Sequence, residues 1–127
     1  MKEETKNWLL QAKEHFEDAE FMYSGHRYSM CVYCYHQALE KILKAAIVEY
    51  ANKLPAKIHN LDTLARETGL KFMDNDLEDL AEITRHFWRV RYPDFRKYVY
   101  TNQKVVEPTV VKSRKIYLWV LQQLETI

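Results

Sequence analysis

The chain of 127 residues is 47% apolar and 29% charged, which is the composition of one globular domain and excludes a disordered chain. Its net charge of +1 gives no overall attraction to nucleic acid, so any such interaction has to come from a local patch. It has only 2 glycines and 3 prolines, which favours a few long helices over many short strands. No apolar run is long enough for a membrane span or an export signal, so we expect a cytoplasmic protein that does not contact a membrane.

Two long helices are predicted at the start of the chain. Residues 3–24 carry apolar groups at steps of three and four, which is one face of an α-helix, and Gly25 is predicted as the C′ residue that ends it. Residues 27–53 carry paired apolar positions on every turn. Such a wide stripe indicates a helix that is packed from two sides and lies at the centre of the fold, and Pro55 then stops it.

Two further helices are predicted in the middle of the chain. A third, short helix has Asn60 as its N-cap and ends at Gly69. A fourth begins near Asp74, and Pro93 lies where this helix should end or kink.

The last third of the chain is predicted to hold one long connection and one helix. Residues 94–106 show no periodicity and are expected to be irregular, and Glu107 and Pro108 are expected to open the last helix with proline at its first position. Residues 1–127 are therefore predicted to form a single all-α domain, an up-and-down bundle of four to five helices.

Outside the fourth helix, we expect the reactive side chains to have structural roles. Cys31 and Cys34 have the spacing of a metal or redox pair, but they lie inside a periodic helix without a second pair, so we predict buried thiols and neither a metal nor a cofactor. Glu40 and Lys44 are predicted to form an ion pair on an exposed helix face. His59 is expected to hold its loop by a hydrogen bond.

The basic run from Thr84 to Lys97 is the stretch that most strongly suggests chemistry. It sets one acid, Asp94, against a group of bases: Arg85, Arg89, Arg91, Arg96 and Lys97. Steps of three and four along a helix place four side chains on one face: Arg85, Trp88, Arg89 and Tyr92.

Arg91 is predicted to continue the apolar stripe of the fourth helix. A guanidinium at the edge of a core needs either a phosphate or a buried carboxylate as its partner. Trp88 and Tyr92 can stack on bases beside it. The residues predicted to bind nucleotide or RNA are Arg85, Trp88, Arg89, Arg91, Tyr92 and Arg96. The alternative is a solvated basic face with ordinary aromatic packing.

Three segments in this order resemble the HEPN family of small helical proteins. Tyr35–Ala45 is similar to the Gln-Ala-x-Glu-Lys-x-x-Lys-Ala helix of that family, and His59–Leu64 is similar to its His-x-Leu-x-x-Leu segment. Arg91–Asp94 resembles the Arg-Tyr-Pro found in many members at the end of the fourth helix. The resemblance implies a homodimeric bundle, RNA or nucleotide as ligand, and a minimal nucleotidyltransferase as partner in a toxin–antitoxin-type pair.

The resemblance also implies site residues. Members that are metal-independent ribonuclease toxins carry Arg, four to six residues and then His, and some extend this to Arg-x4-His-x-Tyr. Arg85 and Tyr92 match the outer positions as catalytic candidates, but Val90 stands where the family has His. His86 is a weaker candidate because it lies about 100° round the helix from Arg85. In some pairs the partner attaches AMP to a tyrosine, and Tyr92 is the candidate acceptor here.

Three functional interpretations stay open at this point. The first is a nucleotide- or RNA-phosphate-binding subunit that acts with a nucleotidyltransferase. The second is an active endoribonuclease toxin, against which the valine at position 90 argues, because proton transfer near neutral pH is suited to histidine. The third is a protein-interaction module whose basic run docks an acidic partner.

Overall fold

The computed structural model describes residues 1–126, except the side chains of Phe95, Lys97 and Tyr98, and is all-helical within that range. Two long helices come first, α1 (Glu3–Ser24) and α2 (Tyr28–Ala46), and α2 continues into the π-helical turn η1 (Ile47–Ala51). The others are α3 (Leu61–Glu67), α4 (Asp74–Arg89), α5 (Pro93–Tyr98) and α6 (Gln103–Glu125). The predicted all-α bundle is thus confirmed. The prediction that residues 94–106 are irregular was wrong at both ends, because α5 begins at Pro93 and covers the start of this stretch and α6 covers its end.

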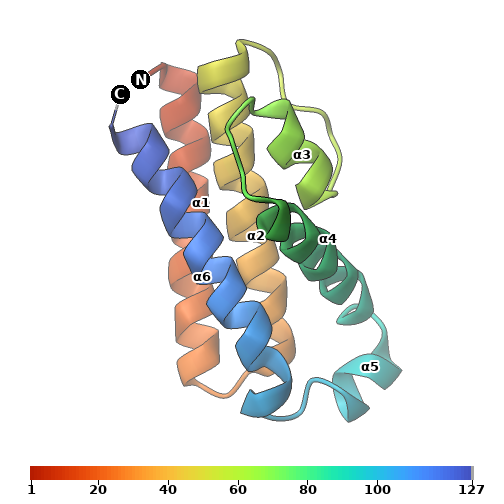
Figure 1. Cartoon of the computed structure of the whole chain (residues 1–127). Coiled ribbons are helices and arrows are strands. Elements are labelled where there is room, and N and C mark those ends of the chain that lie inside the picture. Colours follow the sequence, from red (N-terminus) through yellow and green to blue (C-terminus); the bar gives the residue numbers. More distant parts are fainter. Residues whose placement is uncertain (127) are drawn as a thin grey trace.

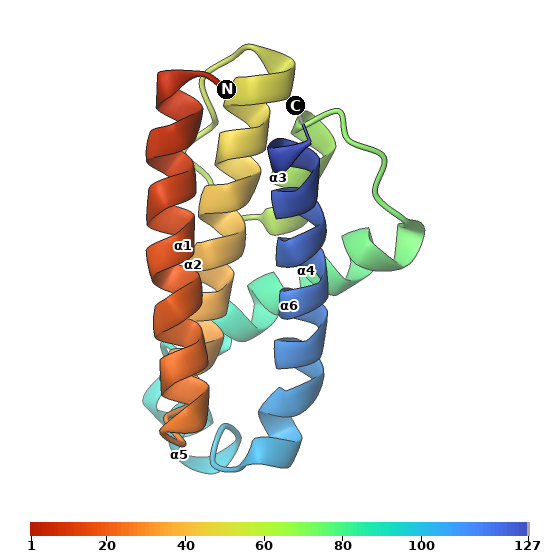
Figure 2. The ribbon, with the colours of Figure 1, turned by 90° about the vertical axis from the view of Figure 1, so that its left-hand side faces the viewer.

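The long helices α1, α2 and α6 stand side by side, and the chain runs down α1 and up both α2 and α6 (Figures 1 and 2). Helix α4 descends obliquely on the side of α2 away from α1, with α3 above it (Figure 1). Between Ala38 and Val48, every side chain of α2 and η1 is buried except that of Lys41, which keeps partial solvent contact. This confirms the prediction that the second helix is packed from two sides.

The first turn of the chain differs by one residue from the prediction. Gly25 has an ordinary negative φ of −86°, and His26 takes the left-handed conformation with φ 62°. The amide of Arg27 donates to the carbonyl of Met22 (2.8 Å) and that of His26 to Tyr23 (3.2 Å), which is a Schellman motif with His26 at C′.

The start of the last helix was also predicted wrongly. Helix α6 begins at Gln103 because the Asn102 side chain caps it by accepting a hydrogen bond from the Val105 amide at 3.2 Å. Pro108 lies inside the helix. It is the sixth residue of the helix, past the first turn, so its ring replaces the amide that would donate to the Lys104 carbonyl and the helix loses that hydrogen bond. None of the helices in the described range is long and apolar enough to cross a bilayer.

Candidate functional site

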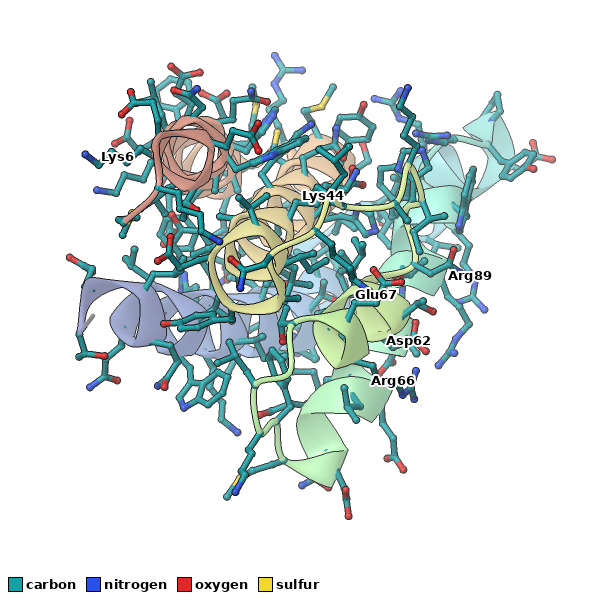
Figure 3. The ribbon with its side chains drawn as sticks, turned by 90° about the horizontal axis from the view of Figure 1, so that it is seen from above. Lys6, Lys44, Asp62, Arg66, Glu67 and Arg89 are labelled. Atoms are coloured by element: carbon teal, nitrogen blue, oxygen red, sulfur yellow. The ribbon has the colours of Figure 1, made fainter. Side chains whose placement is uncertain are left out.

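The end of α4 divides the basic run into three parts. Arg85, Trp88 and Arg89 lie exposed on the last turns of the helix, as the face prediction required. The helix ends at Arg89, so Tyr92 follows in the turn and does not continue that face, and here the prediction was wrong. Tyr92 is 60% exposed. Figure 3 shows Arg89 at the outer edge of the bundle, away from the core.

Arg91 does not enter the core either. Its side chain is exposed, and its guanidinium carbon lies 4.3 Å from the ring centroid of Phe87 and 4.8 Å from that of Trp88. Among the described residues, no carboxylate forms an ion pair with it. The aromatic faces hold the cation by cation–π attraction, which leaves the N–H groups at its edge available to an anion.

Arg91 and Arg96 share a groove with the start of α2. The Arg96 Nε donates to the Ser29 hydroxyl at 3.3 Å, which ties α5 to α2. Two hollows of about 150 and 490 Å³ share these residues and therefore adjoin each other. We call this site the arginine groove, lined by Ser29, Met30, Tyr33, Val90, Arg91, Pro93 and Arg96. Arg85 and Tyr92 do not line it, and the side chain of Lys97 lies outside the described residues.

His86 belongs to a separate polar cluster between α4 and the start of α6. Its Nδ1 lies 2.7 Å from the Tyr100 hydroxyl, and its Nε2 lies 3.7 Å from Glu82 Oε1. Burial lowers the pKa of His86 below its ordinary value; the Glu82 carboxylate opposes that change, and the charges of Arg89 and Arg85 add to it. The cluster therefore favours a neutral imidazole beside two arginines.

Val90 lies in the core. It is 4% exposed and packs in a buried cluster with Cys31, Tyr35 and Tyr100. Its small exposed part lines the arginine groove, and a valine has no group that can transfer a proton. Arg85 and Val90, which stand at the Arg and His positions of the family motif, therefore do not form a catalytic pair in this chain.

A buried carboxylate was missed by the sequence interpretation. Glu40 is 3% exposed and accepts hydrogen bonds from His59 Nδ1 at 2.8 Å and from Lys44 Nζ at 3.1 Å. Burial alone would raise the pKa of Glu40, but the bonds from His59 and Lys44 outweigh it and hold that pKa below its ordinary value. The prediction of an exposed pair was wrong, and Figure 3 shows Lys44 near the middle of the bundle. The signal that could have found Glu40 was its place in the wide apolar stripe of the second helix.

His36 lies behind this carboxylate. It is fully buried, its ring stacks on Phe87 with centroids 3.7 Å apart, and its Nε2 donates to the His59 carbonyl at 3.0 Å. The loop before α3 is therefore held through both the side chain and the backbone of His59, which confirms the expected structural bond.

The two cysteines are free and buried, as predicted. Burial raises the pKa of the Cys31 thiol to about 12, so it stays protonated at neutral pH. Both thiols therefore behave as small apolar side chains in the core.

The fold and this site define a class: a small all-helical bundle with an exposed arginine-lined groove where its fourth helix ends. The HEPN domain profile matches residues 5–124, so the chain belongs to the HEPN domain family. HEPN domains are typically associated with nucleotides or RNA. The crystal structure of TT1696 from Thermus thermophilus has the same fold, with a TM-score of 0.79 and 21% identity over 93% of this chain and 96% of that one. No curated protein was found to match the sequence.

Proposed function

We propose that the protein binds the phosphates of a nucleotide or of RNA in the arginine groove, as the HEPN subunit that acts with a minimal nucleotidyltransferase. The observation that carries the proposal is that Arg91 and Arg96 line the same hollow, where Arg96 is hydrogen-bonded to the Ser29 hydroxyl. Neither arginine forms an ion pair with a carboxylate within the described part of the chain. Two guanidinium groups on one hollow offer the fork-shaped donors that phosphate oxygens accept.

Neighbouring side chains extend this site in a way that suits a nucleic acid. Trp88 is 42% exposed and adjoins Arg91, so it offers a ring face on which a base can stack. Arg85 and Arg89 add positive charge along the same end of α4. The net charge of only +1 means that this local concentration has to supply the attraction.

The test is the affinity for a fluorescently labelled RNA oligonucleotide, measured by anisotropy at several salt concentrations. Arg91→Ala and Arg96→Ala should each weaken binding to all sequences and reduce the slope of log affinity against log salt by about 1. Arg66→Ala is the matched control because Arg66 pairs with Asp62 on α3 at 3.2 Å. Equal affinities in all four proteins would refute the proposal. If RNA and nucleotides all fail to bind, the acidic-partner interpretation becomes the better one.

We also propose that the partner modifies Tyr92. The side chain is 60% exposed and follows directly after Arg91, which can hold the phosphates of the incoming nucleotide. Incubation with ATP and the nucleotidyltransferase should add one AMP to the intact mass, and Tyr92→Phe should abolish that addition. An adduct that survives in the phenylalanine variant would place the acceptor elsewhere.

A second candidate function is cleavage of the bound RNA. The observation in its favour is the half-buried His86, which contacts the Tyr100 hydroxyl and lies near the charges of Arg85 and Arg89. A neutral imidazole beside two arginines can accept a proton while a phosphate is held. Activity that depends on Arg85 and His86 would support this candidate.

A further inference from the structure

The three segments that carry the family resemblance meet at one place in the fold. Glu40 comes from α2, His59 from the loop before α3, and Arg91 from the turn after α4. Glu40 bonds to His59, and both His59 and Arg91 lie against the rings of Phe87 and Trp88. Residues far apart in the chain thus form one cluster that reaches the surface.

The hydrogen bond between Glu40 and His59 fixes the orientation of the His59 imidazole ring. Glu40 is buried, whereas the His59 side chain is 45% exposed, and His59 Nδ1 lies 2.8 Å from Glu40 Oε1. Lys44 donates a hydrogen bond to the other carboxylate oxygen, and the pKa of Glu40 is lowered, so Glu40 is ionised and can only accept hydrogen bonds. His59 Nδ1 must therefore carry the proton, and a neutral ring then has its lone pair on Nε2.

His59 and Arg91 are neighbours across shared aromatic rings. The imidazole centroid lies 6.0 Å from the ring of Trp88 and 5.9 Å from that of Phe87. The guanidinium carbon of Arg91 lies 4.8 and 4.3 Å from the same two rings. His59 and Arg91 therefore lie against the same two rings, and the inference below requires that one bound nucleotide contacts both.

We propose that His59, oriented by Glu40, is the proton-transfer residue of a ribonuclease site whose phosphate is held by Arg91. The inference rests on the proposed binding of RNA in the arginine groove. His59 Nε2 takes the proton of a ribose 2′-hydroxyl, and the 2′-oxygen forms a bond to the adjacent phosphorus. The bond from phosphorus to the 5′-oxygen breaks, and that oxygen takes the proton back from the imidazolium. The products are a 2′,3′-cyclic phosphate and a 5′-hydroxyl.

A purely structural role for His59 needs only the Nδ1 bond to Glu40, whereas proton transfer also needs Nε2. A substitution that keeps the first atom and removes the second can therefore separate the two roles. Asparagine places its amide nitrogen close to the position of Nδ1 but has nothing at the position of Nε2. His59→Asn should therefore keep the loop in place and remove the proton-transfer atom. His15→Asn, a change at a half-buried histidine of α1, is the matched control.

The experiment incubates each purified protein with an RNA oligonucleotide in EDTA and measures binding and cleavage separately. Wild type should release fragments that end in 2′,3′-cyclic phosphate, and a 2′-deoxy substitution at the cleaved position should block this. His59→Asn should slow cleavage by about 100-fold or more without a comparable loss of affinity, whereas His15→Asn should behave as wild type. Free imidazole should restore part of the activity of His59→Ala.

The other outcomes separate this inference from the proposed function. Tight RNA binding without any cleavage, or cleavage unchanged in His59→Asn, overturns the inference and leaves the binding function standing. Cleavage that disappears in His86→Asn but persists in His59→Asn moves the chemistry to the cluster at Tyr100. Failure of the wild-type protein to bind RNA overturns the inference, and failure to bind nucleotides as well overturns the proposed function.

Discussion

Two ionisable side chains, Glu40 and His36, are buried side by side in the core. Glu40 is shared by Lys44 and His59, and His36 fills the space between Glu40 and the ring of Phe87. A carboxylate removed from water is costly unless donors surround it, and here the donors come from the same helix and from the loop that covers it. Loss of any one donor should therefore loosen the loop before α3.

The buried His36 predicts how stability depends on pH. Burial lowers the pKa of His36 to about 4, against the attraction of the Glu40 carboxylate, whereas an unfolded histidine titrates near 6.5. The unfolded chain thus binds the extra proton first, so the stabilisation is complete above about pH 6.5 and falls as the pH drops towards 4, by up to about 3 kcal/mol.

Urea unfolding at about pH 7 and about pH 5 measures this loss. His36→Gln keeps a donor for the His59 carbonyl but does not titrate in this range, so it should lose less stability on acidification than wild type. The same loss in both proteins would mean that other groups are responsible.

At the scale of elements, α4 supplies the cap of α3. Asn60 stands at the predicted N-cap position, but its side chain makes no capping bond. The hydroxyl of Thr84 on α4 accepts from the Leu61 amide at 3.1 Å instead. The two helices therefore order each other, which a cap inside the α3 sequence would not achieve.

Thr84→Val tests this arrangement because it replaces only the hydroxyl and leaves the Leu61 amide buried without an acceptor. We expect a loss of about 1–3 kcal/mol in the free energy of unfolding, measured in urea. Thr63→Val on the exposed side of α3 is the control and should change stability by less than about 0.5 kcal/mol. A neutral Thr84→Val variant would show that another group satisfies the amide.

At the scale of the whole molecule, we propose a homodimer. Large apolar side chains remain on the surface of the single chain, among them Phe21 at 75% and Leu118 at 52% exposure. Light scattering at micromolar concentration should give twice the chain mass of 15.3 kDa. A particle of one chain mass at this concentration would contradict the dimer.

Local pattern was enough to predict the helices because periodicity and helix ends depend on near neighbours. The wide stripe of residues 27–53 predicted the central helix, and Gly69 with φ 78° follows α3 as expected. The first residue of α6 could not be predicted this way. Asn102 as an N-cap and Pro108 as a first helical residue are both ordinary helix starts, and the structure uses Asn102. The basic run was also recognised from composition alone.

The grouping of the site was decided by tertiary structure, because it depends on which distant segments pack together. Helix α4 ends at Arg89, which leaves Tyr92 in the turn after the helix, and α5 brings Arg96 to Ser29. Glu40 was expected at the surface, but the elements packed around α2 bury it, and it bonds to His59. The sequence alone thus determined an all-helical HEPN domain with a basic end to its fourth helix. Packing decided which cations and which histidine share a surface, since burial and through-space contact are not local properties of a chain.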